Sequence, residues 1–483
     1  MPEVDKLLLD RNSSLKEALE LIDKNAMGIA FIVDSDKKML GLLSDGDARR
    51  ALLKGNNLDS NVQAVMNSNF ISLPVETDSE AVLKYLSNKI KNIPLVDNKG
   101  RVVDYATIKK LRTISIASPV LSGNELAYVT DCLRTNWISS QGKYVKQFES
   151  MFSEIHSGFS SLAVSNGTVA LHLALEALNI GEGDEVIVPD LTFVASINAI
   201  IYTGATPVLA DIDPQSLNID TKKITSLITN KTKAIMPVHL YGNPCDMDEI
   251  MQIAKEHNLF IVEDCAEALG SYYKGKPLGT FGDVSTFSFY GNKTITTGEG
   301  GMVIFKDSKT ADRAAMLRDH GMKKTKRYWH EEVGYNYRLT NIQAAIGVAQ
   351  LERLSDFVAA KRHIAQTYNN CIEKSNYFQL PYEDSDTINS YWLYTVLVKE
   401  NSPFKRDDVM SYLDQYGIET RPVFYPAHEM PPYKEYGKKE NLIISKKTSI
   451  AGFSLPSSAS LTAVDLERIC EVLKKFINKY SKS

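Results

Sequence analysis

The 483-residue sequence predicts an α/β protein in which a large doubly wound domain is preceded by an α+β module and followed by a smaller C-terminal α/β domain. Three observations predict this class. Short apolar runs alternate with helical patterns over most of the chain, a long helical stretch at Thr340–Thr367 leads into a second mixed segment, and the N-terminal part is internally repeated. We therefore expect domains at 1–112, 113–360 and 361–483.

The N-terminal module contains two copies of one pattern. The run Ile32–Asp47 matches the run that starts at Leu95, and matched residues lie 63 positions apart. The matched pairs are Asp34 and Asp97, Gly41 and Asp104, Ser44 and Thr107, and Asp47 and Lys110. Helix, strand, strand and helix are predicted in the first half at 14–25, 29–33, 40–43 and 45–53. Because neither half has enough apolar sequence for its own core, the two halves should pack together.

Seven short apolar runs predict the strands of the large domain. They are 161–164, 185–188, 206–209, 233–236, 259–263, 284–289 and 301–305. In the C-terminal part, 391–398 is strand-like and 464–480 is helical. Open α/β sheets bind ligands at the carboxyl ends of their parallel strands, so functional side chains are expected just after these runs.

Lys293 follows one of these strands. The run Ser285–Gly301 carries this lysine in a loop between an apolar strand and a glycine cluster. A lone lysine among aromatic and hydroxyl side chains favours a lowered pKa, which Schiff-base chemistry with a carbonyl requires. The alternative is a surface lysine beside a glycine hairpin.

Asp264 ends another predicted strand, within Leu259–Glu267. A carboxylate at this position can pair with the protonated ring nitrogen of pyridoxal phosphate and keep the ring an effective electron acceptor. The alternative for this acidic segment is a helix cap.

A third strand runs into Ser165–Thr168, and a helical pattern follows it. Backbone N–H groups at a helix start, with Gly167 permitting close approach, form a seat for a phosphate group, although a cap without a ligand has the same pattern. Phe193 follows a further strand, where it can lie against a flat ring or pack in the core.

These four segments, in this order, resemble the DegT-type sugar-nucleotide aminotransferases, which are fold-type-I pyridoxal phosphate enzymes. The resemblance runs from about Ile114 to the C-terminus. The motifs that carry it also include Gly123–Glu125, Asn136–Gly142, Pro237–Gly242 and Gly334–Asn341.

The resemblance implies a role for each site residue. Lys293 would form the Schiff base with pyridoxal 5'-phosphate and then act as general base and acid, and Asp264 would hold the ring nitrogen. The remaining cofactor contacts would be Gly167, Thr168 and Ser288 at the phosphate, Phe193 stacked on the ring, and Glu267 near it. Asn336 would reach the phosphate of a neighbouring subunit's cofactor. This last role implies a homodimer, or a dimer of dimers, with shared active sites.

The run Tyr328–His330, followed by Gly334–Arg338, is most similar to the GDP-perosamine synthases. By this resemblance, the amino donor is L-glutamate and the acceptor is the 4-keto group of GDP-4-keto-6-deoxy-D-mannose. His330, Arg421 and His428 are candidate substrate contacts. Two alternatives remain: an aminotransferase for a UDP- or dTDP-linked keto sugar, and a non-catalytic nucleotide-sensing regulator of the same fold.

The N-terminal module resembles a pair of cystathionine-β-synthase (CBS) domains. Gly41, Ser44 and Asp47 fit the family pattern for binding the ribose and phosphate of an adenine nucleotide. The second half departs from it, with Asp104 and Lys110 at the corresponding positions, so at most one intact site is expected. The alternative is a module that binds nothing and supports assembly.

Composition limits the remaining functions. The net charge of −4 gives no positive field for nucleic acid or an anionic membrane. Five scattered cysteines without C-x-x-C spacing favour neither a disulfide framework nor a zinc site, and no metal is expected. The N-terminus lacks the pattern of a signal peptide, and polar residues interrupt the most apolar region, so a cytoplasmic location is expected.

Overall fold

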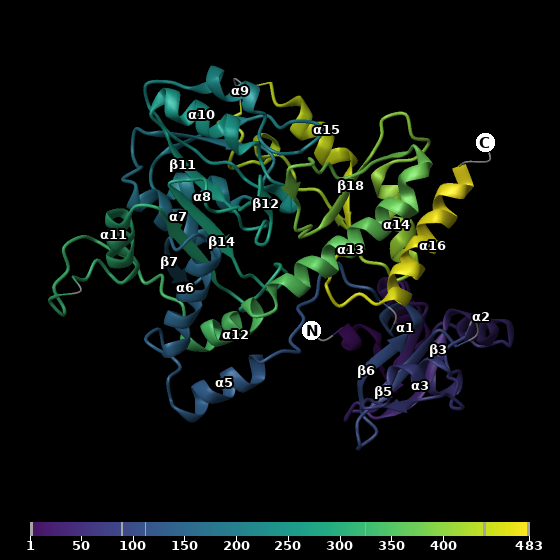
Figure 1. The fold of residues 1–483 in the computed structure, drawn as a ribbon. Helices are drawn as coiled ribbons and strands as arrows, with labels where there is room; N and C mark the ends of the chain where they lie inside the picture. The colour runs from purple at the N-terminus through teal and green to yellow at the C-terminus, as the bar shows by residue number, and fades with distance from the viewer. Residues whose placement is uncertain (1–2, 88–89, 112, 324, 438–440, 481–483) are drawn as a thin grey trace. The chain divides into compact units, whose positions relative to one another are not determined.

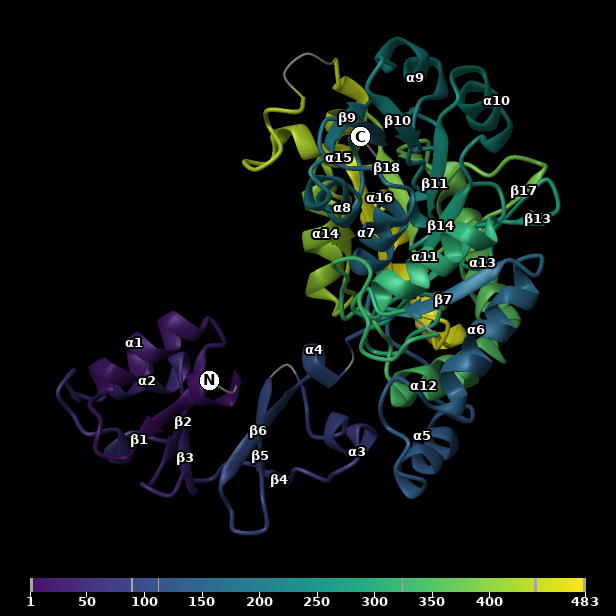
Figure 2. The same cartoon turned by 90° about the vertical axis from the view of Figure 1, so that its left-hand side faces the viewer.

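The computed structural model describes residues 3–87, 90–111, 113–323, 325–437 and 441–480. The chain forms two compact units (Figures 1 and 2). The first is Met1–Thr113, and the second takes in Ile114–Asp414 and Ile418–Ser483. Among the described residues, no helix combines the length and the apolar character needed to cross a membrane.

Each half of the first unit has a three-stranded sheet. The strands are β1 (Leu8–Asp10), β2 (Ile29–Val33) and β3 (Met39–Ser44), then β4 (Leu73–Pro74), β5 (Asn92–Val96) and β6 (Val102–Thr107). In both sheets the first strand is parallel to the second, which is antiparallel to the third. Because β5 and β6 begin and end 63 residues after β2 and β3, the repeat predicted from the sequence is a structural repeat.

Short helices accompany these strands. They are η1 (Glu3–Leu7), α1 (Leu15–Asn25), α2 (Asp45–Leu53), η2 (Val62–Ala64), α3 (Ser79–Leu83) and α4 (Ile108–Leu111). Backbone hydrogen bonds join the two halves, from Met39 N to Gly100 O (3.1 Å) and from Val102 N to Lys37 O (2.9 Å). The halves therefore pack together, as their small cores require.

A seven-stranded sheet forms the centre of the second unit, in the order β7-β15-β14-β11-β10-β8-β9. Its strands are β7 (Ser160–Val164), β8 (Glu185–Pro189), β9 (Thr206–Ala210), β10 (Thr232–Ile235), β11 (Phe260–Asp264), β14 (Val284–Ser288) and β15 (Gly301–Phe305). β15 is antiparallel to both of its neighbours, and the other pairings are parallel. Each strand lies within one residue of its predicted position at both ends.

Helices cover both faces of this sheet (Figure 1). One face carries α7 (Gly167–Ala177), α8 (Ala195–Tyr202) and α11 (Ser308–Arg318). The other carries α5 (Glu125–Arg134), α6 (Lys143–Ile155), α9 (Thr221–Leu227), α10 (Met247–His257) and α12 (Asn341–Leu351). Strand residues alternate between the two cores: Val186 and Val188 face one, and Ile187 faces the other. The predicted doubly wound fold is confirmed.

The C-terminal part has its own four-stranded sheet in the order β16-β18-β20-β19. Its elements are α13 (Leu354–Ile372), η4 (Glu373–Ser375), β16 (Phe378–Gln379), β18 (Tyr394–Val398), α14 (Arg406–Gln415), β19 (Arg421–Pro422), η5 (Ala427–Glu429), α15 (Ile443–Ala451), β20 (Gly452–Leu455) and α16 (Ala463–Tyr480). A further small sheet joins β12 (Tyr272–Tyr273), β13 (Lys276–Pro277) and β17 (Thr387–Ile388), and η3 spans Leu240–Gly242.

The helical stretch predicted at Thr340–Thr367 is present as two successive helices, α12 and α13, with a break at Glu352 and Arg353 that the sequence pattern did not indicate. At the break, Glu352 accepts hydrogen bonds from Asn124 (2.8 Å) and Tyr128 (2.7 Å), and Arg353 donates one to Ser122 (2.9 Å). These long-range bonds stabilise a break at which the sequence has no glycine or proline. α12 packs in the core beside the seven-stranded sheet, whereas α13 starts in that core at Phe357 and continues into the core of the C-terminal sheet.

Candidate active site

The predicted cofactor residues of four segments lie at the carboxyl edge of the seven-stranded sheet. β11 ends at Asp264, and its parallel neighbour β14 ends at Ser288. Lys293 lies in the loop after β14, and α7 begins at Gly167. The topology therefore brings together segments that are more than a hundred residues apart in the chain.

Lys293 is largely buried, and its amine lies between a carboxylate and an aromatic ring. Only 12% of its side chain is exposed, and Nζ lies 3.6 Å from Oε1 of Glu267. On another side, Nζ lies 3.7 Å from the centroid of the Trp392 ring. Burial lowers the pKa of Lys293, the carboxylates of Glu267 and Asp264 oppose this, and the charge of Arg421 adds to the lowering. A lysine in this environment gives up its proton more readily than a surface lysine.

Asp264 is held in a fixed orientation. Its Oδ2 accepts a hydrogen bond from Ser196 Oγ (2.7 Å), and Oδ1 accepts one from the backbone N–H of Ala266 (3.1 Å). Burial raises the pKa of Asp264, while the bonds from Ser196 and Ala266 and the charge of Lys293 oppose the rise. A cationic partner, such as a protonated ring nitrogen, would favour the charged form of this carboxylate.

Glu267 lies on the other side of the lysine amine. It is buried and accepts a hydrogen bond from the backbone N–H of Tyr241 (2.7 Å). Burial raises the pKa of Glu267, and Lys293 is the first of the groups that oppose this. Tyr241 has a left-handed backbone (φ 56°), which is uncommon for a large side chain.

Gly167, Thr168 and Ser288 form a cradle at the start of α7. A Cβ atom on Gly167 would lie 2.8 Å from Cβ of Ser288, so only glycine permits this approach. Asn166 caps the helix by accepting a hydrogen bond from Val169 N (3.0 Å). The free N–H groups and the dipole of a helix N-terminus attract phosphate, and the Ser288 hydroxyl stands directly beside them.

Phe193 follows β8 and is 55% exposed, so it is not a core side chain. Its ring centroid lies 5.9 Å from that of Phe424. The residues around Lys293 thus fit pyridoxal phosphate. They offer a largely buried amine for its aldehyde, an oriented carboxylate for its ring nitrogen, a helix N-terminus for its phosphate and an exposed aromatic ring for its face.

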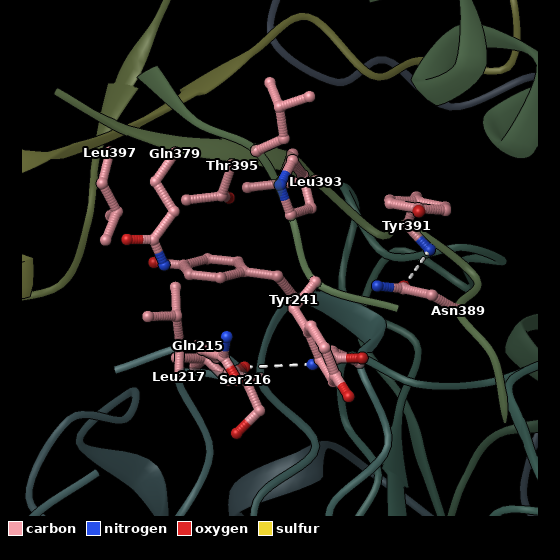
Figure 3. A pocket seen from close by; sticks show the side chains of 15 residues that line it. Gln215, Ser216, Leu217, Tyr241, Gln379, Asn389, Tyr391, Leu393, Thr395 and Leu397 are labelled. Atoms are coloured by element: carbon pink, nitrogen blue, oxygen red, sulfur yellow. Dashed lines mark hydrogen bonds between the residues drawn. The ribbon is translucent and has the colours of Figure 1, made fainter. Parts of the chain in front are cut away.

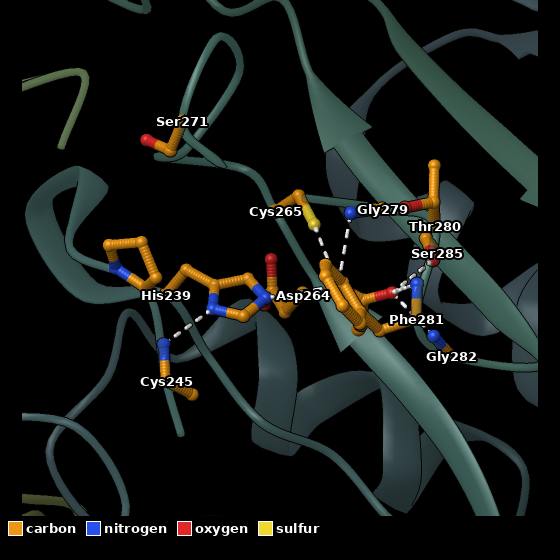
Figure 4. Close-up of polar contacts among 12 residues, drawn as sticks. His239, Cys245, Asp264, Cys265, Ser271, Gly279, Thr280, Phe281, Gly282 and Ser285 are labelled. Atoms are coloured by element: carbon orange, nitrogen blue, oxygen red, sulfur yellow. Dashed lines mark hydrogen bonds and ion pairs between the residues drawn. The ribbon is translucent and has the colours of Figure 1, made fainter. Parts of the chain in front are cut away.

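Glu263, the neighbour of Asp264, has a structural role. It accepts hydrogen bonds from His239 Nε2 (3.2 Å), Ser285 Oγ (3.0 Å) and the backbone N–H groups of Gly279, Phe281 and Gly282. Burial alone would raise the pKa of Glu263, but these bonds, led by the one from His239, hold it below its usual value. His239 Nδ1 in turn accepts from Cys245 N (3.0 Å), as Figure 4 shows. Glu263 and His239 therefore fix the end of β11 through hydrogen bonds.

A cavity of about 30 Å³ lies beside Tyr241 (Figure 3). Lys293, Asp264 and Ser288 are not among its lining residues. It has room for one or two water molecules but not for a nucleotide sugar.

Two of the candidate substrate residues lie near this site. Arg421, on β19, is close enough for its charge to lower the pKa of Lys293. His428 contacts Asp190 twice, with Nδ1 2.7 Å from Oδ2 and the backbone N 2.9 Å from Oδ1. Asp190 is fully buried directly after β8, so it places His428 at the same sheet edge as Phe193.

His330 and Asn336 are instead exposed residues that lie away from this cluster in the chain, between α11 and α12. His330 Nδ1 lies 2.8 Å from the backbone oxygen of His320, and Asn336 accepts a hydrogen bond from Arg338 Nε (3.2 Å). Arg338 also pairs with Asp319. Within the described part of the chain, His330 and Asn336 hydrogen-bond to their own segment and not to the cluster around Lys293. Their expected roles stay predictions.

Sequence patterns did not indicate Ser196, Trp392, Tyr241 or Asp190 as site residues. Ser196 lies three residues after Phe193 in a helix start, a weak local signal. Trp392 lies just before β18, far from Lys293 along the chain, and no pattern in the sequence relates the two.

In the first unit, Gly41, Ser44 and Asp47 lie where β3 meets α2. Ser44 and Asp47 form a capping box, with Ser44 Oγ donating to Asp47 Oδ2 (2.6 Å) and Asp47 N donating to Ser44 Oγ (3.1 Å). The side chain of Met66 fills the space beside Gly41. In the second half, Lys110 pairs with Asp104, so a cation stands where the first half has a carboxylate.

Comparisons with known proteins agree with this arrangement. The chain matches the DegT/DnrJ/EryC1/StrS aminotransferase family over residues 119–474, and the CBS domain over residues 5–54 and 62–116. It is 50% identical over 366 residues to a GDP-perosamine synthase of Escherichia coli O157:H7, covering 76% of this chain and 99% of the relative. The identity to a GDP-perosamine synthase of Caulobacter vibrioides is 48% over 368 residues, with the same coverage. The crystal structure of an aminotransferase from Psychrobacter cryohalolentis superimposes with a TM-score of 0.72 at 32% identity, covering 75% of this chain and 99% of that one.

Proposed function

Because this chain belongs to the DegT/DnrJ/EryC1/StrS aminotransferase family, we propose that it transfers an amino group to the 4-keto group of a GDP-linked 4-keto-6-deoxy sugar. It is a pyridoxal-phosphate-dependent sugar aminotransferase preceded by a CBS domain pair. The observation that carries the choice of substrate is the high identity to GDP-perosamine synthases over nearly their whole length. The acceptor would be GDP-4-keto-6-deoxy-D-mannose and the product GDP-perosamine.

Bound pyridoxal phosphate would supply an aldehyde that takes up the amino group and a ring that accepts electrons from the reacting carbon. In our proposal, Lys293 bonds to that aldehyde and Asp264 pairs with the ring nitrogen. Ser196 keeps the Asp264 carboxylate oriented. The cradle of Gly167, Thr168 and Ser288 holds the phosphate, and Phe193 lies against the ring.

Once an amino acid displaces it, Lys293 is a free amine in a buried site. Its lowered pKa lets the neutral form take a proton from the donor, and the ammonium form can return that proton at the neighbouring carbon. Between these steps the Glu267 carboxylate stabilises the ammonium form of Lys293, because the two groups lie 3.6 Å apart. L-glutamate is the proposed donor.

Arg421 and His428 are the proposed contacts to the nucleotide sugar. If His428 donates its Nδ1 hydrogen to Asp190, its Nε2 remains an acceptor for a sugar or ribose hydroxyl. Arg421 can offer paired donors to a phosphate or carboxylate group. His330 is proposed as a further contact, from its exposed segment.

Mass-detected turnover with GDP-, UDP- and dTDP-linked 4-keto-6-deoxy sugars, each with L-glutamate, tests this function. We expect the fastest amination with the GDP-linked sugar and none with Lys293→Ala. Faster amination of a UDP- or dTDP-linked sugar would contradict the proposed GDP-linked substrate, but it would be compatible with aminotransferase activity. A protein that gains no visible absorbance band with pyridoxal phosphate would instead be a non-catalytic regulator of this fold.

We also propose that the CBS pair binds one adenine nucleotide, at Gly41, Ser44 and Asp47. The corner between β3 and α2 places a hydroxyl and a carboxylate one helical turn apart, and the second half offers no such pair. Calorimetry with AMP, ATP and S-adenosylmethionine should show binding that Asp47→Ala removes. This site would be contradicted if Asp47→Ala still bound the nucleotide, or if the unchanged protein bound none of the three compounds.

A further inference from the structure

We propose that Trp392 is a positioning residue for Lys293, whose free amine it holds between its indole face and Glu267. This inference rests on the proposed function, in which the Lys293 amine is repeatedly released and bound again. Neither sequence motifs nor the family comparison assign a role to Trp392.

The geometry places the amine directly over the ring. Lys293 Nζ lies 3.7 Å from the centroid of the Trp392 ring, and Glu267 Oε1 lies 3.6 Å from the same nitrogen. Trp392 is only 3% exposed, so water does not weaken the attraction between the ammonium and the ring. Indole is the aromatic side chain that attracts a cation most strongly, and burial strengthens the effect.

Trp392 is itself fixed from several directions. Its Nε1 donates a hydrogen bond to the backbone oxygen of Asn292 (2.7 Å), the residue directly before Lys293. Its own backbone oxygen accepts from Nζ of the buried Lys361 (3.1 Å), which also donates to Ser457 O (2.7 Å). The ring of Tyr241 stacks on it at 6.2 Å and 14°.

Two residues next to the contact between Lys293 and Trp392 have a strained backbone. Tyr391, next to Trp392, has a left-handed backbone (φ 49°), as has Tyr241. Gly242 permits the segment of Tyr391 to approach, since a Cβ atom there would lie 2.9 Å from Tyr391 N. Large residues adopt such a backbone only where the surroundings enforce it, and such positions concentrate at functional sites.

The ring face has a definite chemical effect. It stabilises the ammonium form of Lys293 relative to the neutral amine, in the same direction as Glu267 and against the effect of burial. Removing the face should therefore lower the pH at which the amine loses its proton. It should also leave the amine less well placed for bonding to the cofactor.

The test uses cofactor-free full-length protein and two variants, Trp392→Phe and Trp392→Met. Both lose the indole N–H and have side chains of comparable size, but only phenylalanine keeps an aromatic face. The rate at which the protein captures pyridoxal phosphate, followed by visible absorbance, rises as the Lys293 amine loses its proton. We expect the pH midpoint of this rate to be lower for Trp392→Met than for Trp392→Phe, by roughly half a unit to one unit.

A control is Tyr412→Leu, which removes another ring–lysine contact (Lys479 Nζ, 3.9 Å from the ring centroid) and should leave the midpoint unchanged. Equal midpoints for the folded Phe and Met variants would overturn the proposal. If Trp392→Met does not fold, the pH midpoint of Trp392→Phe is compared with that of the unchanged protein instead. The weaker phenyl face predicts a smaller downward shift, and no shift would overturn the proposal. Failure of the unchanged protein to capture the cofactor would count against the proposed function.

Discussion

The orientation of Asp264 depends on a second side chain, that of Ser196. The carboxylate is buried, and a single hydroxyl, that of Ser196, donates a 2.7 Å hydrogen bond that fixes its orientation. The motif around Asp264 predicted its place at a strand end from sequence. The hydroxyl that orients it, 68 residues away, comes from a helix on the face of the sheet that carries α7.

We expect Asp264→Asn to slow amino transfer from L-glutamate by about a hundredfold or more, because an amide cannot balance a protonated ring nitrogen. Ser196→Ala keeps the carboxylate and removes only its hydrogen bond, so a loss of about tenfold is expected. Rapid-mixing absorbance of the cofactor band after addition of L-glutamate measures both rates. An Asp264→Asn rate equal to that of the unchanged protein would contradict the role of Asp264.

At the scale of elements, strands were easier to predict than helix ends. Continuous apolar runs located all seven strands of the large sheet, because burial on both faces requires such runs. The break at Glu352 and Arg353 was missed, because bonds to distant residues stabilise it and its local sequence is compatible with a helix.

The start of α7 allows a prediction about the phosphate cradle. Gly167→Ala places a Cβ atom 2.8 Å from Cβ of Ser288, so we expect a stability loss of about 1–3 kcal/mol and weaker cofactor binding. Ser288→Gly removes the obstructing atom, and the double variant should regain the stability without regaining a hydroxyl at the phosphate. Thermal unfolding and absorbance titration with pyridoxal phosphate measure these effects. An unchanged stability of Gly167→Ala would show that the cradle is not close-packed.

Lys361 on α13 predicts a dependence of stability on pH. Burial lowers the pKa of Lys361 from 10.5 to about 7. Between pH 7 and 10.5 the unfolded chain binds more protons at Lys361 than the folded chain does. The free energy of unfolding therefore rises with pH over this range, and the contribution of Lys361 is lost as the pH falls to about 7. Lys361→Met should remove up to about 1.4 kcal/mol of this change per pH unit. Denaturant unfolding of both proteins between about pH 7 and 9 checks this, and parallel curves would contradict it.

For the whole molecule, the internal repeat gives the clearest agreement between sequence and structure. An offset of 63 residues relates β2 to β5 and β3 to β6, as the matched residues predicted. The family comparison likewise confirms the aminotransferase and CBS resemblances. The reach of Asn336 toward a neighbouring subunit remains a prediction, consistent with its exposed position.

Mixed dimers test that prediction. Lys293→Ala removes the reactive amine of its own site, and Asn336→Ala would weaken the site of the neighbouring subunit. If sites are shared, a dimer of one Lys293→Ala chain and one Asn336→Ala chain contains one intact site, so mixing two impaired proteins should restore activity. Turnover after subunit exchange is the measurement. Activity no greater than the mean of the separate variants would contradict a shared site.

The sequence by itself determined the strands, the repeat and the family, and it indicated Lys293 and Asp264 as candidate site residues, because short-range periodicity and local motifs carry this information. Only the tertiary structure decided that Trp392 lies under Lys293, that Ser196 holds Asp264 and that Asp190 holds His428. These pairs are formed by the order of strands in the sheet and by the packing of the C-terminal segment against it. Neither produces a periodic signal in the chain, since each contact joins residues whose own local sequences are compatible with many other neighbours.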